Sequence, residues 1–126
     1  MNATTHGPRI TAQHVDAVLE ALAGSTSQRH ALTKHGLAFA TGFSARVVEA
    51  TVESIRRDSI ALVASGPDGY WLPATLDEAE ANVERRHARA IHQLETLQGE
   101  RTLIRRLRPA AADAPLVLFE EAVVVA

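Results

Sequence analysis

Apolar residues recur at helical spacing in two segments of the first half of the chain, and cap and breaker residues mark a third helical segment between them. Thr11, Thr33 and Ser44 precede these segments, and a hydroxyl at such a position accepts a hydrogen bond from the first turn of a helix. Gly24 and Gly42 end the first two segments, because glycine readily leaves the helical conformation. The pattern therefore predicts three helices, which start after these caps and run to about residues 23, 41 and 57.

A pattern of period two follows the third predicted helix, in the short runs 60–64 and 70–72. The residues between the runs, SGPDG, contain one proline and two glycines, which favour a tight reversal, and Pro73 closes the second run. We therefore expect a β-hairpin, and the triplet at 30–32 is a candidate for one further, very short strand. The alternating positions are Ile60, Leu62 and Ala64 in the first run and Tyr70 and Leu72 in the second.

One long helical pattern extends from Leu76 to Arg108. Acidic residues in its first turn and arginines in its last suit the helix dipole. A 4-3 alternation like that of a coiled coil runs along this helix, through Val83, His87, Ala90, Leu94, Leu97, Arg101 and Ile104. Pro109 is expected to stop the helix, and residues 109–126 to form a linker and a β-prone tail with apolar runs at 116–119 and 123–125. The first ten residues show no periodicity and are expected to be a flexible N-terminus.

The composition excludes several classes of protein. The 126 residues suffice for one ordinary domain, and the hydrophobic share of 46% is typical of a globular chain. The chain has no cysteine, which excludes a disulfide framework, a thiol nucleophile and a thiolate zinc site. No apolar run is long enough to span a membrane, and the polar start is not a signal peptide. We therefore expect a soluble, cytoplasmic protein that does not bind membranes.

The net charge and the spacing of the histidines further limit the classes of function that the chain can have. The net charge is −2, so any binding to nucleic acid depends on the placement of a few arginines and not on bulk charge. Two pairs of histidines, His30 with His35 and His87 with His92, are five residues apart, which does not suit shared metal ligation on one helix. We find no glycine loop for phosphate and no nucleophile beside a base. We expect no enzyme, no metal and no cofactor.

The segment LAFATGFSARVVEATVESI, residues 37–55, has the features of two helices that meet at a sharp turn. Ala38 is small enough to let the two backbones approach, and Gly42 tolerates a positive φ at the corner. With the hairpin behind it, the chain over residues 11–73 resembles a winged helix-turn-helix DNA-binding domain of the small bacterial and phage type. In that family an aromatic pair such as Tyr70-Trp71 often follows the glycine turn, and a long arginine-rich helix often follows the wing. The expected fold is therefore mainly α: three helices and a β-hairpin wing, a long C-terminal helix and a short β-prone tail.

The resemblance implies a double-stranded DNA-binding protein, either a transcriptional regulator or a phage- or plasmid-type accessory factor. The third helix would lie in the major groove, where Arg46 can pair with a guanine. Ser44 at the helix start would hold a phosphate, and Ala45 would touch a thymine methyl. Glu49 faces the same side and can accept from cytosine. The expected DNA-binding residues are Ser44, Ala45, Arg46, Glu49, Arg56 and Arg57, of which the last two neutralise phosphates.

A second interpretation stays open, in which this winged helix is a protein–protein interaction module that does not bind DNA. Glu49 and Glu53 lie on the side that would meet DNA, and carboxylates more often repel phosphate. The turn SGPDG has no basic residue and one acid, Asp68, where a DNA-binding wing usually has arginine or lysine. Ser59 stands where the family commonly has glycine.

The long helix points to a partner. Thirty-three residues extend about 50 Å, which is longer than the core of so small a domain can cover. An exposed apolar stripe of that length usually finds a partner, and the simplest one is a second copy. The alternatives are a helix that bends back at Gly99 and a different protein partner on the helix or the tail. We expect a homodimer through Val83, Ala90, Leu94, Leu97 and Ile104.

Overall fold

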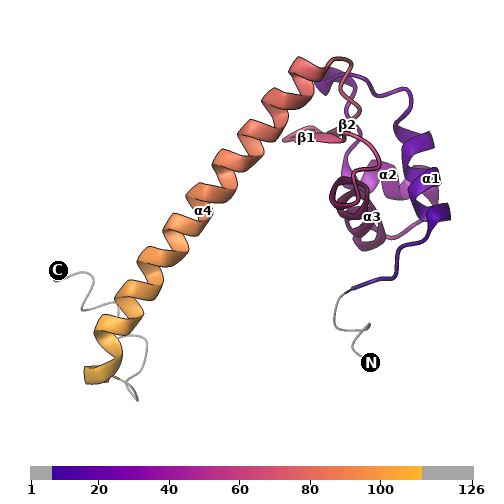
Figure 1. The fold of residues 1–126 in the computed structure, drawn as a ribbon. Coiled ribbons are helices and arrows are strands. Elements are labelled where there is room, and N and C mark those ends of the chain that lie inside the picture. The colour runs from indigo at the N-terminus through magenta and orange to yellow at the C-terminus, as the bar shows by residue number, and fades with distance from the viewer. Residues whose placement is uncertain (1–6, 112–126) are drawn as a thin grey trace. The chain divides into compact units, whose positions relative to one another are not determined.

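The structure is a computed structural model of the chain, and it describes residues 7–111. The described chain is mainly helical, with a small two-stranded antiparallel sheet and a long C-terminal helix (Figure 1). Its internal contacts divide it into a first unit that ends at Glu84 and a second unit that starts at Arg85. The expected strands of the C-terminal tail and residues 1–6 of the expected flexible N-terminus lie outside the described residues.

The three predicted helices of the first unit are confirmed, with bounds close to those expected. They are α1 (Ala12–Leu22), α2 (Lys34–Thr41) and α3 (Ala45–Arg57), with one short 3₁₀ turn, η2 (Gln28–His30), after α1. Each predicted N-cap hydroxyl accepts a hydrogen bond from a backbone N–H in the first turn of its helix. Gly42 ends α2 with φ +78°, the left-handed conformation that the corner between α2 and α3 requires. The N-cap pairs are Thr11 with His14, Thr33 with Gly36, and Ser44 with Val47.

The three helices enclose one hydrophobic core. Their predicted apolar stripes face each other, and the three pairs α1–α2, α1–α3 and α2–α3 are all in contact. Ile10, in the lead-in before α1, is partly buried against the same core. Burial of such side chains stabilises the fold by about 1.5–3 kcal/mol each. The apolar residues of these helices with no exposed surface are Val18, Leu22, Leu37, Val48 and Ile55.

The segment after α3 differs from the prediction. Ile60 was expected to begin a strand, but its N–H donates to the carbonyl of Ile55, and the N–H of Ser59 donates to the carbonyl of Arg56. These two bonds form the left-handed cap that commonly ends helices. Ser59 accordingly has φ +56°, a conformation that glycine adopts more readily than serine. Because the cap uses residues 59–60, the strand starts later and the alternation over 60–64 is not a strand pattern.

The predicted hairpin is confirmed in shorter form, as β1 (Ala64–Gly66) and β2 (Gly69–Trp71). The strands are antiparallel, and Gly66 pairs with Gly69 across the turn Pro67-Asp68. Ile60 and Leu62, expected in the first strand, are about half exposed, whereas Val63 and Ala64 are buried. Trp71 is buried as well, with 1% of its surface exposed. The hairpin and the residue before it therefore contribute the side chains of Val63, Ala64 and Trp71 to the core.

Both edges of the hairpin are hydrogen-bonded to other parts of the first unit. The N–H and carbonyl of Tyr70 pair with the carbonyl and N–H of Leu32, at 2.8 and 2.9 Å, so the short strand expected at 30–32 is confirmed as a single bridge. The backbone of Gly69 lies so close to this bridge that a Cβ there would overlap the Leu32 carbonyl oxygen. On the other edge, the side-chain amide of Asn82 bonds the N–H and the carbonyl of Ser65. The hairpin is thus held on both sides.

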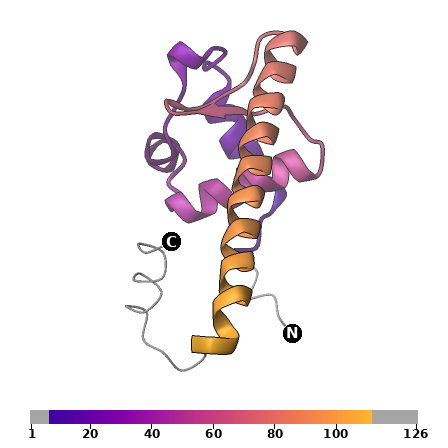
Figure 2. The same cartoon turned by 90° about the vertical axis from the view of Figure 1, so that its left-hand side faces the viewer.

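The long helix, α4, spans Leu76–Ala111 without a break (Figure 2). It begins in the first unit, where Ala79 and Asn82 are buried. It continues through Gly99, so the alternative in which the chain bends back there is wrong. The helix also passes the expected stop at Pro109 by two residues.

Candidate nucleic-acid interface

The side of α3 that faces away from the core carries the residues that the sequence assigned to DNA. Arg46, in the first turn, is exposed, and so are Glu49 and Glu53 one and two turns further along. Val48, Val52 and Ile55 are buried on the opposite side. The predicted division of α3 into a buried and an exposed side is therefore confirmed.

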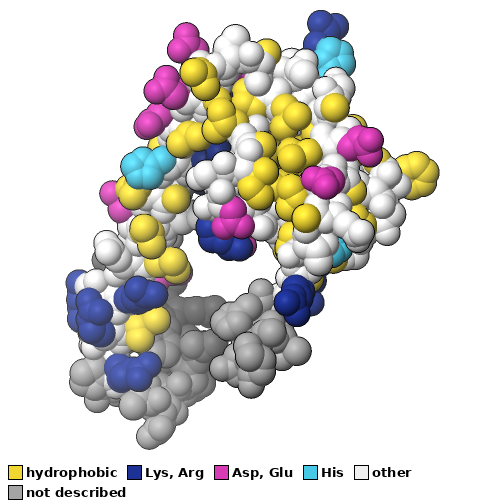
Figure 3. Space-filling model, turned by 45° about the vertical axis from the view of Figure 1, so that its right-hand side comes forward, with side chains coloured by type: hydrophobic (Ala, Val, Ile, Leu, Met, Phe, Trp, Pro, Cys, Tyr) yellow, Lys and Arg dark blue, Asp and Glu magenta, His cyan; other side chains and the backbone are white. Residues whose placement is uncertain are grey.

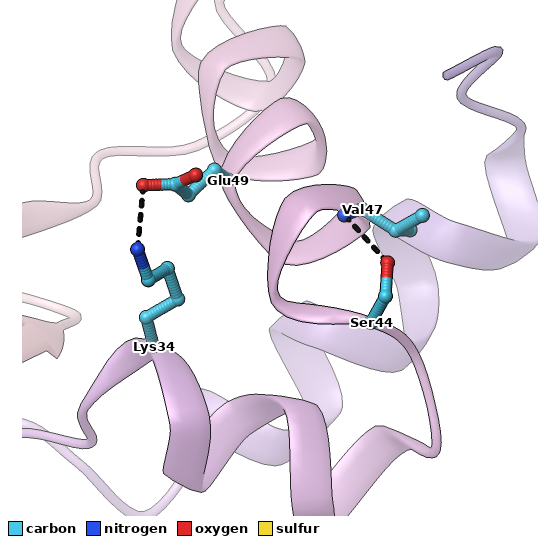
Figure 4. A network of polar contacts seen from close by, with 4 residues as sticks. All are labelled: Lys34, Ser44, Val47 and Glu49. Carbon is cyan, nitrogen blue, oxygen red and sulfur yellow. Dashed lines mark hydrogen bonds and ion pairs between the residues drawn. The ribbon is translucent and has the colours of Figure 1, made fainter. Parts of the chain in front are cut away.

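Glu49 forms an ion pair with a basic side chain from another helix. Its carboxylate oxygen lies 3.1 Å from the ammonium of Lys34, the first residue of α2 (Figure 4). Both side chains are partly exposed, so the pair adds little to stability, but it neutralises the carboxylate. Sequence reasoning left Lys34 out, because only the packing of α2 against α3 brings residues 34 and 49 together.

Glu53 also has a basic neighbour. The guanidinium of Arg57 lies 3.7 Å from its carboxylate, one turn along α3, and both side chains are largely exposed. This spacing is a common one for ion pairs on a helix surface. Both acids on the exposed side of α3 therefore have a basic partner.

Arg56 joins α3 to the hairpin. Its guanidinium donates to the carbonyl of Val63, at 2.8 and 3.1 Å, and to the hydroxyl of Ser65 at 2.9 Å. The same guanidinium lies 6.0 Å from the ring centre of Tyr70. Arg56 thus positions the hairpin beside α3, a role that the sequence prediction of a phosphate contact did not include.

An open hollow of about 490 Å³ runs along α3. Arg46, Glu49, Glu53 and Arg56 line it, so the structure brings four of the charged residues of α3 to one surface. Gly7 and Pro8, from the lead-in before α1, form part of its wall. Ser44, Ala45 and Arg57 do not line this hollow.

A second hollow, of about 330 Å³, lies between the N-terminus of α2 and the hairpin. It shares Glu49, Arg56 and Tyr70 with the first hollow and adds Thr33 and Lys34. The two hollows together make one continuous polar surface beside the hairpin. We call this surface, formed by Lys34, Arg46, Glu49, Glu53, Arg56 and Tyr70, the α3 surface.

Tyr70 is the aromatic residue of the α3 surface. Burial raises the pKa of its hydroxyl above the ordinary value of 10.0, and the nearby charge of Glu49 raises it further. The positive charges of Arg56 and Lys34 act in the opposite direction and lower this pKa. The phenol is therefore neutral at physiological pH and able to donate a hydrogen bond.

The helix cap predicted at Ser44 is confirmed. Its hydroxyl accepts from the N–H of Val47 at 3.2 Å, which makes it the helix cap (Figure 4). Ser44 is exposed and Ala45 is partly exposed at the first position of the helix. The hairpin turn holds the acid Asp68, whose carboxylate accepts from the side chain of Gln28 at 3.4 Å. No basic residue lies in this turn.

Among residues 7–111, no helix combines the length and apolar character needed to cross a membrane, and no three metal-binding side chains gather at one place. Comparison with known protein families, curated proteins and solved structures finds no match for this chain.

Proposed function

We propose that residues 11–73 form a winged helix-turn-helix domain that binds double-stranded DNA, with α3 in the major groove and the hairpin as the wing. The observation that carries this proposal is the pairing of both acids on the exposed side of α3. Glu49 and Glu53 gave the strongest sequence argument against DNA binding, and the carboxylate of each lies beside a basic side chain. Lys34, Arg46, Arg56 and Arg57 supply four positive charges against these two negative ones, an excess of two.

The position of Arg46 supports a role in base recognition. It lies in the first turn of α3, the part of a recognition helix that reaches base edges. A guanidinium there can donate two hydrogen bonds to O6 and N7 of a guanine. The first backbone N–H groups of the helix have no acceptor within the helix and favour a phosphate nearby. Lys34, at the start of α2, offsets the charge of Glu49 and so reduces its repulsion of the DNA backbone.

Selection from a pool of random duplexes, followed by titration of the selected duplex, tests the proposal. We expect enrichment of a defined sequence, and we expect Arg46→Ala to weaken binding to it by about 1–3 kcal/mol. Arg46→Ala should also relax the preference at one base position. Arg89→Ala is the matched control, because it removes the same charge from an exposed position of α4.

Fluorescence of Trp71, the only tryptophan in the chain, reports whether each variant is folded. Absence of enrichment and of binding at low salt would overturn the proposal and favour the protein–protein interaction module. Equal losses for Arg46→Ala and Arg89→Ala would show that α3 does not read the bases.

A further inference from the structure

We propose that two copies of this chain associate through their α4 helices and that the helices run antiparallel. This inference is independent of DNA binding. It rests on the exposed apolar positions of α4 and on the distribution of charge along that helix.

The apolar positions of α4 form a seam at coiled-coil spacing. Val83, Ala90, Leu97 and Ile104 follow each other at intervals of seven residues, and Leu94 lies between two of them. Leu94, Leu97 and Ile104 are 54%, 46% and 47% exposed. A surface helix rarely leaves such a seam in water, because its burial against a second helix is favourable.

The polar residues of the seam disfavour a parallel pair. His87 and Arg101 occupy the seam positions between the apolar ones. In a parallel pair each seam residue faces its own copy, so Arg101 would face Arg101 of the second chain. Two like charges in that position destabilise the pair and have no acid within the same layer.

The distribution of charge along α4 also disfavours a parallel pair, because acidic and basic side chains lie toward opposite ends of the helix (Figure 3). Residues 76–84 contain four acids and no base, whereas residues 98–108 contain four arginines and one acid. Parallel helices would bring acid to acid at one end and base to base at the other. Antiparallel helices bring the acidic end of each beside the basic end of the other, which lowers the electrostatic energy.

One antiparallel register satisfies both the seam and the charges. When Leu94 faces Ala90 of the second copy, Leu97 faces His87, and the leucine side chains fill the space beside the small alanine. Arg101 then faces Val83 of the other helix, where Glu80 lies about one turn before Val83 and Glu84 directly follows it. The pair would be centred near residue 92.

Sedimentation equilibrium over a wide range of concentrations tests the association. We expect a dimer for the wild-type chain and a monomer for Leu94→Asp. Thr96→Asp, which places the same charge on an exposed position outside the seam, should remain dimeric. A wild-type monomer at every concentration, or an effect of Thr96→Asp equal to that of Leu94→Asp, would overturn the proposal.

Disulfide formation tests the direction, because the chain has no cysteine of its own. In the proposed register the double variant His87→Cys/Leu97→Cys forms covalent dimers on mild oxidation, whereas the single variant His87→Cys does not. The two positions are about 15 Å apart along one helix, too far for a disulfide within one chain. Rapid cross-linking of His87→Cys alone would show a parallel pair and contradict the inference.

Discussion

At the scale of single residues, the charged side chains of the α3 surface act on the pKa of Tyr70. Tyr70 is the only tyrosine of the chain, so the absorbance of its phenolate reports the titration of this one group. Burial and Glu49 raise its pKa, which means that folding favours the neutral phenol. The resulting stability is fully present below the ordinary pKa of 10.0 and is lost as the pH rises through the folded-state value.

We expect Glu49→Gln to lower the pKa of Tyr70, because it removes one of the two causes that raise it. The midpoint of the Tyr70 titration should move down, while burial, the larger of the two causes, still acts to raise the pKa. Spectrophotometric titration of the folded protein measures this midpoint. Glu53→Gln is the control and should leave the midpoint unchanged. An unaltered midpoint in Glu49→Gln would show that Glu49 does not face the ring in solution.

At the scale of elements, the hairpin is a two-stranded sheet too short to be stable alone. It is held by the Leu32 bridge on one edge and by the amide of Asn82, from the start of α4, on the other. Asn82 is 1% exposed, so its amide has no ready access to water. The first turns of α4 are therefore part of the fold that positions the hairpin.

We expect Asn82→Ala to lower the free energy of unfolding by about 2 kcal/mol, because two hydrogen bonds to the backbone of Ser65 are lost. Urea denaturation followed by Trp71 fluorescence measures this change. Glu80→Ala, on the exposed side of the same helix, should change stability by no more than about 0.5 kcal/mol. If the two variants lose equal stability, the amide of Asn82 does not support the hairpin.

At the scale of the whole molecule, the small number of basic residues near α3 limits how steeply the proposed DNA binding would depend on salt. If Lys34, Arg46, Arg56 and Arg57 are the only bases near phosphate, log K falls with log salt with a slope of at most about −3.6 per protomer. Titrations of the selected duplex at several salt concentrations give this slope. A steeper slope would show that arginines of α4 also contact DNA.

The sequence determined the local features of this protein. Helix caps, helix lengths and the glycine at the α2–α3 corner depend on residues within a few positions of each other, so Thr11, Thr33, Ser44 and Gly42 could be assigned from the pattern. The exposed and buried sides of α3 followed from its period. The strand start was placed too early because the left-handed cap at Ser59 uses residues that also alternate in hydrophobicity.

Only the tertiary structure decided how distant charges and polar groups are paired. Lys34 meets Glu49 because α2 packs on α3, Arg56 bonds Val63 because the hairpin lies against α3, and Asn82 bonds Ser65 because α4 starts beside β1. None of these pairs has a periodic signal, since each depends on the angle at which two elements pack. The sequence alone therefore made the exposed side of α3 look more acidic than it is. The net charge of that surface also depends on side chains of other elements, such as Lys34, that the fold places beside it.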